Sequence, residues 1–426
     1  MKPSFQLLAT SLFVGMWLSA CAAPELGPTV MPAIGALSQP LLRLAPDLPK
    51  ATGPKSAVLF AFVAMDDKLT LQGDKFLNAL ESTAGPELYT IAFADALGPD
   101  NSHLYAIEPD ADAKTLASPR SFLSPTLKEV SSNDPATISG TLNWALTTYP
   151  AKFTALDFFA HGGGYLGLGT DATQVGPTKR SVLPLGDFGT ALRQGLKGRK
   201  LDLINLLSCQ MGNVETAYEL RDLADVLIAS EDNISAGDAS TIAFTAELNR
   251  QLRTPQPDAR VIGRQMAIFA EATQMGSDYR AISAVELARM DEIKRTVNVL
   301  TNDLLAAMPT HGEAILKAYD AVPNIVISNS SQRDLWTFCK HLNQDVNDPV
   351  IRKSSLAVKA AVKKALLHTR DRENERCQGL SICMPPRKDI HKIMAWPLFQ
   401  ASLNSQFAKA TGWNRFIEAV KATVPA

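Results

Sequence analysis

Four continuous apolar runs constrain the fold of this 426-residue chain more than any other feature. Each is short enough for a strand and lacks the alternation of a sheet face exposed to water, so each indicates a strand covered on both sides. Segments suited to helices separate several of these runs, and such alternation is typical of a parallel sheet with helices packed against it. We therefore predict an α/β fold with a mostly parallel central sheet. The runs are residues 57–65, 88–94, 154–159 and 201–207.

One of the helices expected between these runs has a clear start signal. Asp134 can cap a helix over residues 136–148. Pro135 suits the first helical position, where the missing amide costs nothing. The other expected elements are helices at 69–80, 186–196 and 213–224 and short strands at 103–107, 165–169 and 226–229.

Beyond residue 243 the sequence pattern becomes mostly helical. We place a soft domain boundary after residue 282, which divides a core at 56–282 from a mostly helical C-terminal region at 283–426. In this second part helices are expected at 267–273, 284–305, 312–319 and 356–368, and strands near 325–327 and at 379–384.

The first residues have the shape of an export signal. Met1-Lys2 precedes a mostly apolar run, 5–17, that is too short to span a bilayer. The run ends in Leu18-Ser-Ala-Cys21, which resembles the lipobox of bacterial lipoproteins, where the cysteine is the lipidation site. We therefore predict a lipoprotein signal peptide at 1–21 and lipid attachment at Cys21. A plain secretory signal, cleaved nearby, is the alternative.

The segment after this signal, 22–55, is rich in proline and predicts an extended tether. With a lipid on Cys21, the tether would hold the protein at a membrane surface. The residue after this cysteine is Ala22, whereas an aspartate at that position is associated with retention of a lipoprotein in the inner membrane. We therefore expect an exported bacterial lipoprotein at the outer membrane or cell surface, or in the periplasm.

His161 and Cys209 are the candidate catalytic residues, because each lies two residues beyond the end of a predicted strand. Open α/β sheets place their chemistry at such strand ends. A thiolate is a good nucleophile, and a nearby histidine favours the thiolate form. The amides of Cys209 and Gly162 can stabilise an oxyanion, and His161 can protonate the leaving amine. The residues thus indicate acyl transfer to Cys209, followed by hydrolysis of a thioester.

The blocks around these two residues resemble the clostripain family of cysteine peptidases, within the caspase-like group. They read Phe158-Phe-Ala-His-Gly-Gly-Gly-Tyr and Leu207-Ser-Cys-Gln-Met-Gly-Asn-Val-Glu-Thr-Ala-Tyr-Glu-Leu-Arg. The second block is the more specific, since it is far longer than a Cys/His pair. The resemblance implies a caspase-like α/β/α sandwich, a His161/Cys209 dyad and a cysteine endopeptidase. Weaker similarities, such as Met65-Asp-Asp-Lys-Leu, extend it over roughly residues 56–386.

Leu207 departs from the family pattern, in which an aspartate two residues before the cysteine selects arginine or lysine in the substrate. Without that carboxylate the preference at P1, the residue before the cleaved bond, stays open. Glu231 or Asp238 could replace it, and Ser208 would also line the substrate site. Family members can be processed in the loop after the histidine strand, where this chain carries Lys179-Arg180.

Composition and spacing limit the expected partners. A formal net charge of −1 gives no excess of basic residues for nucleic acid. The other histidines show no close metal-ligand spacing, so we expect no metal or cofactor. We expect a monomer that acts on a peptide or protein substrate and contacts a membrane through its lipid.

Other readings of the same residues remain open. A buried cysteine is often only packing. His-Gly-Gly-Gly also occurs in lipases and esterases, but these need a Gly-x-Ser-x-Gly elbow that this sequence lacks. The alternative function is a cell-surface lipoprotein that keeps the peptidase fold and binds a partner without cleaving it.

Overall fold

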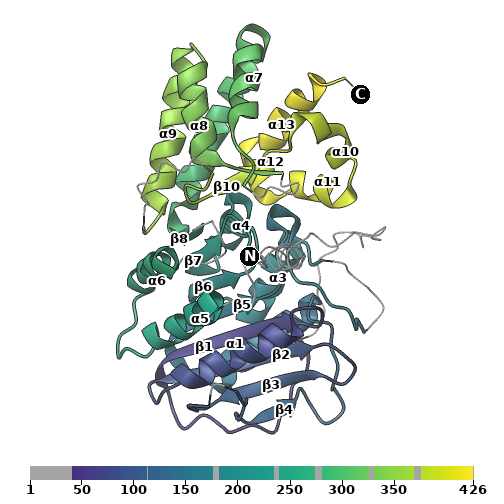
Figure 1. The fold of residues 1–426 in the computed structure, drawn as a ribbon, viewed down its shortest axis with the longest axis vertical. Helices are drawn as coiled ribbons and strands as arrows, with labels where there is room; N and C mark the ends of the chain where they lie inside the picture. Colours follow the sequence, from purple (N-terminus) through teal and green to yellow (C-terminus); the bar gives the residue numbers. More distant parts are fainter. Residues whose placement is uncertain are drawn as a thin grey trace, which may run out of the picture.

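An eight-stranded sheet forms the centre of the computed structural model, which describes residues 41–112, 114–175, 182–234, 239–273, 281–325, 331–368 and 376–425 (Figure 1). The strand order is β4-β3-β2-β1-β5-β6-β7-β8. The five strands from β2 to β7 in this order are parallel, and β3, β4 and β8 are antiparallel to their neighbours. The strands are β1 (Lys55–Met65), β2 (Leu88–Ala96), β3 (Ser102–Ile107), β4 (Arg120–Phe122), β5 (Ala151–Phe159), β6 (Leu201–Leu207), β7 (Ala224–Ser230) and β8 (Ile282–Glu286).

Helices cover both faces of this sheet, so the predicted α/β fold with a mostly parallel sheet is confirmed. Each face has its own apolar core, because the strands are buried on both sides. One face is covered by α1 (Thr70–Thr83), α5 (Ala239–Gln251) and α6 (Ala259–Thr273). The other is covered by α2 (Pro135–Thr148), α3 (Leu185–Leu196) and α4 (Val214–Leu220).

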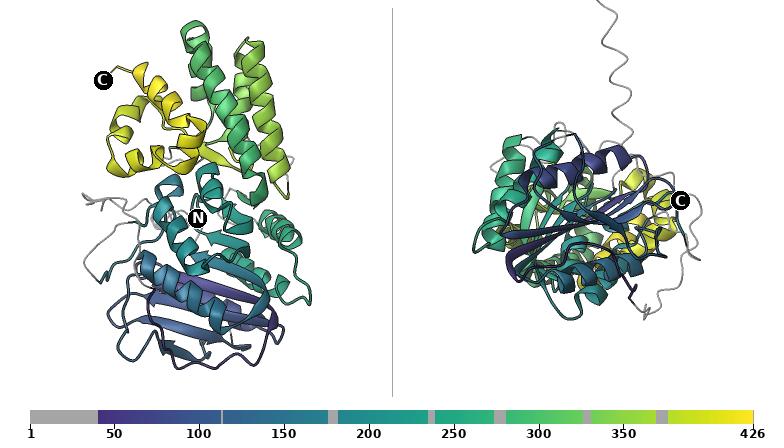
Figure 2. Two further views of the ribbon diagram at one scale, coloured as in Figure 1. Left: turned by 180° about the vertical axis from the view of Figure 1, so that it is seen from behind. Right: turned by 90° about the horizontal axis from the view of Figure 1, so that it is seen from below.

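The C-terminal region packs at one end of the sheet and is mostly helical, as predicted (Figures 1 and 2). A two-stranded sheet, β9 (Gln332–Asp334) and β10 (Ser381–Cys383), joins it to the core, where the Ser381 amide donates to the Gly212 carbonyl at 3.0 Å. The helices are α7 (Met290–Ala321), α8 (Leu335–Asp345), α9 (Pro349–Ala365), α10 (Ile390–Met394), α11 (Pro397–Leu403), α12 (Gln406–Thr411) and α13 (Trp413–Ala422), with 3₁₀ turns η1 (Gly164–Leu166), η2 (Leu287–Arg289) and η3 (Arg387–Asp389).

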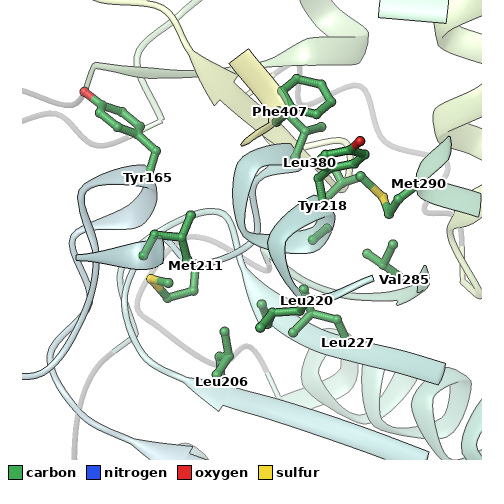
Figure 3. Close-up of a cluster of buried hydrophobic side chains, with 14 of the residues drawn as sticks. Tyr165, Leu206, Met211, Tyr218, Leu220, Leu227, Val285, Met290, Leu380 and Phe407 are labelled. Carbon is green, nitrogen blue, oxygen red and sulfur yellow. The ribbon is translucent and has the colours of Figure 1, made fainter. Parts of the chain in front are cut away.

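The boundary expected after residue 282 needs correction, because it cuts β8. This strand pairs with β7 along its length, so the sheet continues into the supposed C-terminal region. The apolar core on the α4 side also runs into the C-terminal helices. Figure 3 shows this continuity: Leu206 of β6, Leu220 of α4 and Phe407 of α12 belong to one buried cluster.

The tether expected at 22–55 is described only from residue 41, and the described part lies on the core. Residues 41–54 form no helix or strand. Leu42 and Leu44 nevertheless pack on the core, and the Tyr149 hydroxyl donates to the Pro49 carbonyl at 2.7 Å. The apolar side chains between the prolines explain why residues 41–54 pack on the core.

Local expectations failed where short patterns were ambiguous. The strand expected at 165–169 is instead the 3₁₀ turn η1, linked to its surroundings by an isolated bridge between Gly162 and Leu168. The helix expected at 284–305 begins only at Met290, because β8 precedes it. It then continues through Pro309 to Ala321 and includes the separate helix expected at 312–319. Within the described residues, no helix is both long and apolar enough to cross a membrane.

Candidate active site

The sheet register brings His161 and Cys209 to neighbouring strand ends. Near the carboxyl ends of their strands, Phe159 of β5 pairs with Leu207 of β6. Each candidate residue lies two positions beyond this pair and lines the same small cavity. The sequence-predicted neighbours Leu207 and Ser208 line it as well. The parallel strands therefore place the two groups together, as the strand-end argument requires.

An aspartate that the sequence argument did not single out lies beside the histidine. Asp67 follows β1, which pairs with β5 on the side opposite β6. Its Oδ2 atom is 3.4 Å from Nε2 of His161. The same carboxylate accepts hydrogen bonds from the Thr170 hydroxyl and, at 2.7 Å, from the Leu69 amide. These bonds fix the carboxylate, so Asp67 is placed to orient the imidazole.

The environment of His161 favours its neutral form. Burial lowers the pKa of the imidazole below its usual 6.5, the Asp67 carboxylate raises it and Lys68 lowers it. Desolvation is the largest of these effects, since it disfavours the charged ring. A neutral imidazole at pH 7 can accept a proton from a thiol, which is the role of a general base.

The thiol of Cys209 is almost enclosed. Only 5% of the residue is exposed. The Ile234 amide donates to Sγ at 3.4 Å, and Sγ lies 3.6 Å from the Ile234 carbonyl oxygen. A hydrogen bond to sulfur stabilises a thiolate relative to a thiol. Ile234 therefore both donates a hydrogen bond to this sulfur and covers it.

A short turn separates Cys209 from helix α4, which begins within one residue of the predicted start at 213. Helix α4 starts at Val214, capped by Asn213, whose side chain accepts from the Thr216 amide at 2.7 Å. The intervening turn includes Gln210 at a φ of 64°. Because the helix begins five residues after the cysteine, its N-terminus is not directly at the thiol. The amides close to the site belong to the turn.

Gly162 approaches the backbone of Cys209 so closely that no other residue fits. A Cβ atom at this position would lie 2.1 Å from the Cys209 carbonyl oxygen and 2.8 Å from its amide nitrogen. The bridge between Gly162 and Leu168 uses the amides of Gly163 and Gly169, so the Gly162 amide takes no part in it. The two amides expected to stabilise an oxyanion thus lie side by side.

The cavity beside the dyad is small and largely apolar. Its volume of about 10 Å³ corresponds to roughly one water molecule. No carboxylate lines it within the described residues. The lining residues are Leu69, Phe159, Ala160, His161, Leu207, Ser208, Cys209 and Ile234.

Glu231 does not belong to this cavity, contrary to the sequence expectation. It is fully buried and accepts a hydrogen bond from the amide of Gly379, ahead of β10. Its role is to hold the C-terminal region on the core, and burial keeps it from a substrate. Asp238, Lys179, Arg180 and Cys21 lie outside the described residues. The four described cysteines, Cys209, Cys339, Cys377 and Cys383, form no disulfide bond with one another.

The sheet and its helices define a caspase-like α/β fold. The proteins that match this chain are cysteine peptidases. The model of the clostripain family, Peptidase_C11, matches residues 93–419. The chain therefore belongs to the clostripain family and is a cysteine peptidase, a hydrolase.

Solved structures share this fold at low sequence identity. An inactive zymogen C11 protease from Parabacteroides distasonis is 16% identical with a TM-score of 0.62. A secreted C11 cysteine protease from Bacteroides thetaiotaomicron, in complex with an irreversible peptide inhibitor, is 15% identical with a TM-score of 0.59. Each comparison covers 84% of this chain and 99% of the other. A comparison with curated protein sequences finds no match.

Asp67→Asn should slow turnover and move its pH dependence. The amide keeps the shape but removes the charge that raises the pKa of His161. We expect kcat to fall roughly tenfold to a hundredfold with little change in KM, since the substrate does not bind through this group. The acidic limb of the pH profile, where the imidazole gains a proton and can no longer act as a base, should move to lower pH. Steady-state kinetics from pH 5 to 9 measures both effects, and an unmoved limb would show that Asp67 has only a structural role.

Proposed function

We propose that this chain is an endopeptidase that uses Cys209 as nucleophile and His161 as general base and acid. The observation that carries the proposal is that both residues line one cavity at neighbouring strand ends. Membership of a peptidase family supports it, and so does the peptide inhibitor bound to the protein from Bacteroides thetaiotaomicron.

The reaction divides into acylation and hydrolysis. His161 takes the thiol proton, and the sulfur of Cys209 attacks the substrate carbonyl carbon. The amides of Gly162 and Cys209 donate to the oxyanion. The C–N bond then breaks, His161 gives its proton to the leaving amine, and a thioester remains. Water, deprotonated by His161, hydrolyses the thioester and restores the thiol.

The substrate residue before the cleaved bond is proposed to be apolar. The cavity next to the dyad is walled by Leu69, Leu207 and Ile234, and a buried arginine or lysine would find no carboxylate in this wall. A desolvated, unpaired cation is strongly unfavourable. Because the cavity holds only about one water molecule, substrate binding must displace the Ile234 side chain.

A library of internally quenched peptides, varied at P1, tests this proposal. We expect apolar P1 residues to be cleaved with a kcat/KM at least about tenfold above arginine or lysine. A preference for arginine or lysine would contradict the apolar pocket and point to Asp238 as its acidic partner. Binding of peptides without any cleavage would favour the alternative, a partner-binding lipoprotein. With an apolar pocket, self-cleavage after Lys179 or Arg180 should be slow.

The lipid anchor at Cys21 is proposed from the Leu18-Ser-Ala-Cys21 sequence alone. It would place the peptidase on the outer membrane or cell surface of a bacterium, facing exported or external proteins. Membrane fractionation of the full chain and of Cys21→Ala tests this, and only the unchanged chain should be recovered with the membrane.

A further inference from the structure

The C-terminal region contacts both segments that follow the candidate catalytic residues. We call residues 162–169 the histidine loop and residues 210–213 the cysteine turn. Strand β10 bonds to the cysteine turn at the carbonyl of Gly212. Helix α11 packs on the histidine loop, where the rings of Phe399 and Tyr165 meet edge to face with their centroids 5.7 Å apart. The C-terminal region thus touches both segments, although the residues that line the cavity beside the dyad all come from the core.

The side chain of Gln332 lies between these two segments. Gln332 is the first residue of β9 and is only 1% exposed. Its side-chain nitrogen donates to the Gln210 carbonyl at 3.3 Å, and its side-chain oxygen accepts from the Tyr165 amide at 3.1 Å. The carboxamide takes this orientation because it pairs each donor with an acceptor. One buried side chain of the C-terminal region therefore joins the histidine loop to the cysteine turn.

Both backbone groups that Gln332 reaches need support from outside their own segment. Tyr165 is the second residue of the 3₁₀ turn η1, and an amide at the start of such a turn has no partner within it. Gln210 directly follows the nucleophile and has a φ of 64°, which a residue other than glycine rarely adopts. Its carbonyl also accepts from the Asn213 side chain at 3.0 Å. Two side chains therefore stabilise an uncommon backbone conformation next to Cys209.

Gly164 makes room for the carboxamide in the histidine loop. This glycine has a φ of 64°, and a Cβ atom added to it would overlap the side-chain amide of Gln332. Two glycines after His161 thus permit two close contacts. Gly162 lies against the Cys209 backbone, and Gly164 lies against the Gln332 side chain. The glycine-rich sequence therefore fits the histidine loop between the cysteine turn and the C-terminal region.

We propose that Gln332 is a positioning residue, which holds His161 and Cys209 at their reactive separation by bonding the segments that follow them. This role rests on the proposed function, because it takes His161 and Cys209 as the reacting pair. Gln210 is the next residue after the nucleophile, so a movement of its peptide group is transmitted directly to the thiol. The position requires one donor and one acceptor on the same planar group, which a glutamine side chain supplies. The C-terminal region then contributes to catalysis without touching the substrate.

Gln332→Met removes both hydrogen bonds and keeps the approximate length and volume of the side chain. We expect kcat to fall roughly tenfold to a hundredfold while KM changes by less than about threefold, because displacement of reacting groups by about 1 Å costs roughly 10²-fold in rate. Steady-state kinetics with the best library peptide measures both constants.

Gln406→Met is the matched control. Gln406 lies on α12, and its side-chain nitrogen donates to Oε1 of Glu219 on α4 at 3.3 Å. The control therefore makes the same chemical change and also removes a hydrogen bond between the C-terminal region and the core. Its kcat and KM should stay within about twofold of the unchanged chain.

Gln332→Glu gives a readout that ordinary packing would not produce. A protonated carboxyl group can donate to the Gln210 carbonyl and accept from the Tyr165 amide, as the carboxamide does, whereas the ionised group offers acceptors only. The ratio of its kcat to that of the unchanged chain should therefore rise roughly tenfold from pH 8 to pH 5. Because both chains contain His161, the titration of this residue largely cancels in the ratio. This variant also replaces Gln332→Met in the comparison if the latter does not fold.

Alkylation of Cys209 by iodoacetamide separates the positioning role from the proposed function, because it needs no peptide turnover. The midpoint of the alkylation rate against pH should lie about 0.5 pH units or more higher in Gln332→Met, since a displaced His161 no longer favours the thiolate. A shifted midpoint in a chain that cleaves no peptide would refute the peptidase function but retain the role of Gln332. An unchanged midpoint and unchanged kcat in Gln332→Met, even with a lower Tm, would overturn the proposal. A constant kcat ratio for Gln332→Glu between pH 8 and pH 5 would also contradict it.

Discussion

Cys209→Ala will reduce peptide hydrolysis to background, and His161→Ala will lower kcat by roughly 10³-fold or more. The first change removes the sulfur atom that forms the thioester in the proposed reaction. The second removes the base that activates the thiol and the acid that protonates the leaving amine. The double variant should be no worse than Cys209→Ala, because the two groups act as one unit. Turnover of the best library peptide measures these losses.

An irreversible, thiol-reactive peptide probe gives a second readout of the same pair. It should label the unchanged chain, label His161→Ala slowly and leave Cys209→Ala unlabelled. Cys339→Ala is the matched control: this thiol is fully buried in α8, and burial raises its pKa far above the usual range. Labelling should therefore persist in that variant. Turnover that survives in Cys209→Ala would refute the assigned nucleophile.

The positions of His161 and Cys209, the proposed dyad, could be predicted from the sequence because strands buried on both faces leave a clear apolar pattern. The runs before His161 and Cys209 predicted the ends of β5 and β6, and the sheet register then brought these ends together. Asp67 carried a weaker signal. It follows a predicted strand, but only the strand order, with β1 beside β5, reveals that it reaches His161.

Other parts of the site depended on contacts between distant segments. Glu231 was expected to replace the acidic residue missing at position 207, yet it is fully buried and its carboxylate accepts a hydrogen bond from the Gly379 amide. The strand β8 was read as the start of a helix, since its five residues have no distinctive period.

Ile234 covers the thiol of Cys209 and also lines the pocket beside it. Ile234 follows β7, contacts Sγ of Cys209 and forms part of the apolar wall with Leu207. The same side chain thus restricts access to the nucleophile and shapes the pocket beside it. A substrate residue that replaces Ile234 in this wall would meet the same apolar surroundings, which is why we propose an apolar P1 side chain.

Gly162→Ala is expected to cause the second large loss of peptidase activity, because it changes the backbone geometry at the site. The added methyl group would meet the Cys209 carbonyl oxygen at 2.1 Å. Because that oxygen belongs to the backbone, no side-chain rotation can relieve the contact, and the His161 loop must move away from the Cys209 turn. Overpacking of this kind costs about 1–3 kcal/mol of stability. A displacement of about 1 Å between reacting groups costs roughly 10²-fold in rate.

Gly186→Ala is the matched control for this change. It lies in the first turn of α3, and an added Cβ there would meet no atom within 4 Å. Alanine favours a helix by about 1 kcal/mol over glycine, so Tm should stay constant or rise while kcat/KM is unchanged. Thermal unfolding and steady-state kinetics of the two variants separate the contact from a general effect of replacing glycine. Full kcat/KM in Gly162→Ala would mean that the oxyanion is stabilised without this close approach, and the amide of Gly162 would lose its assigned role.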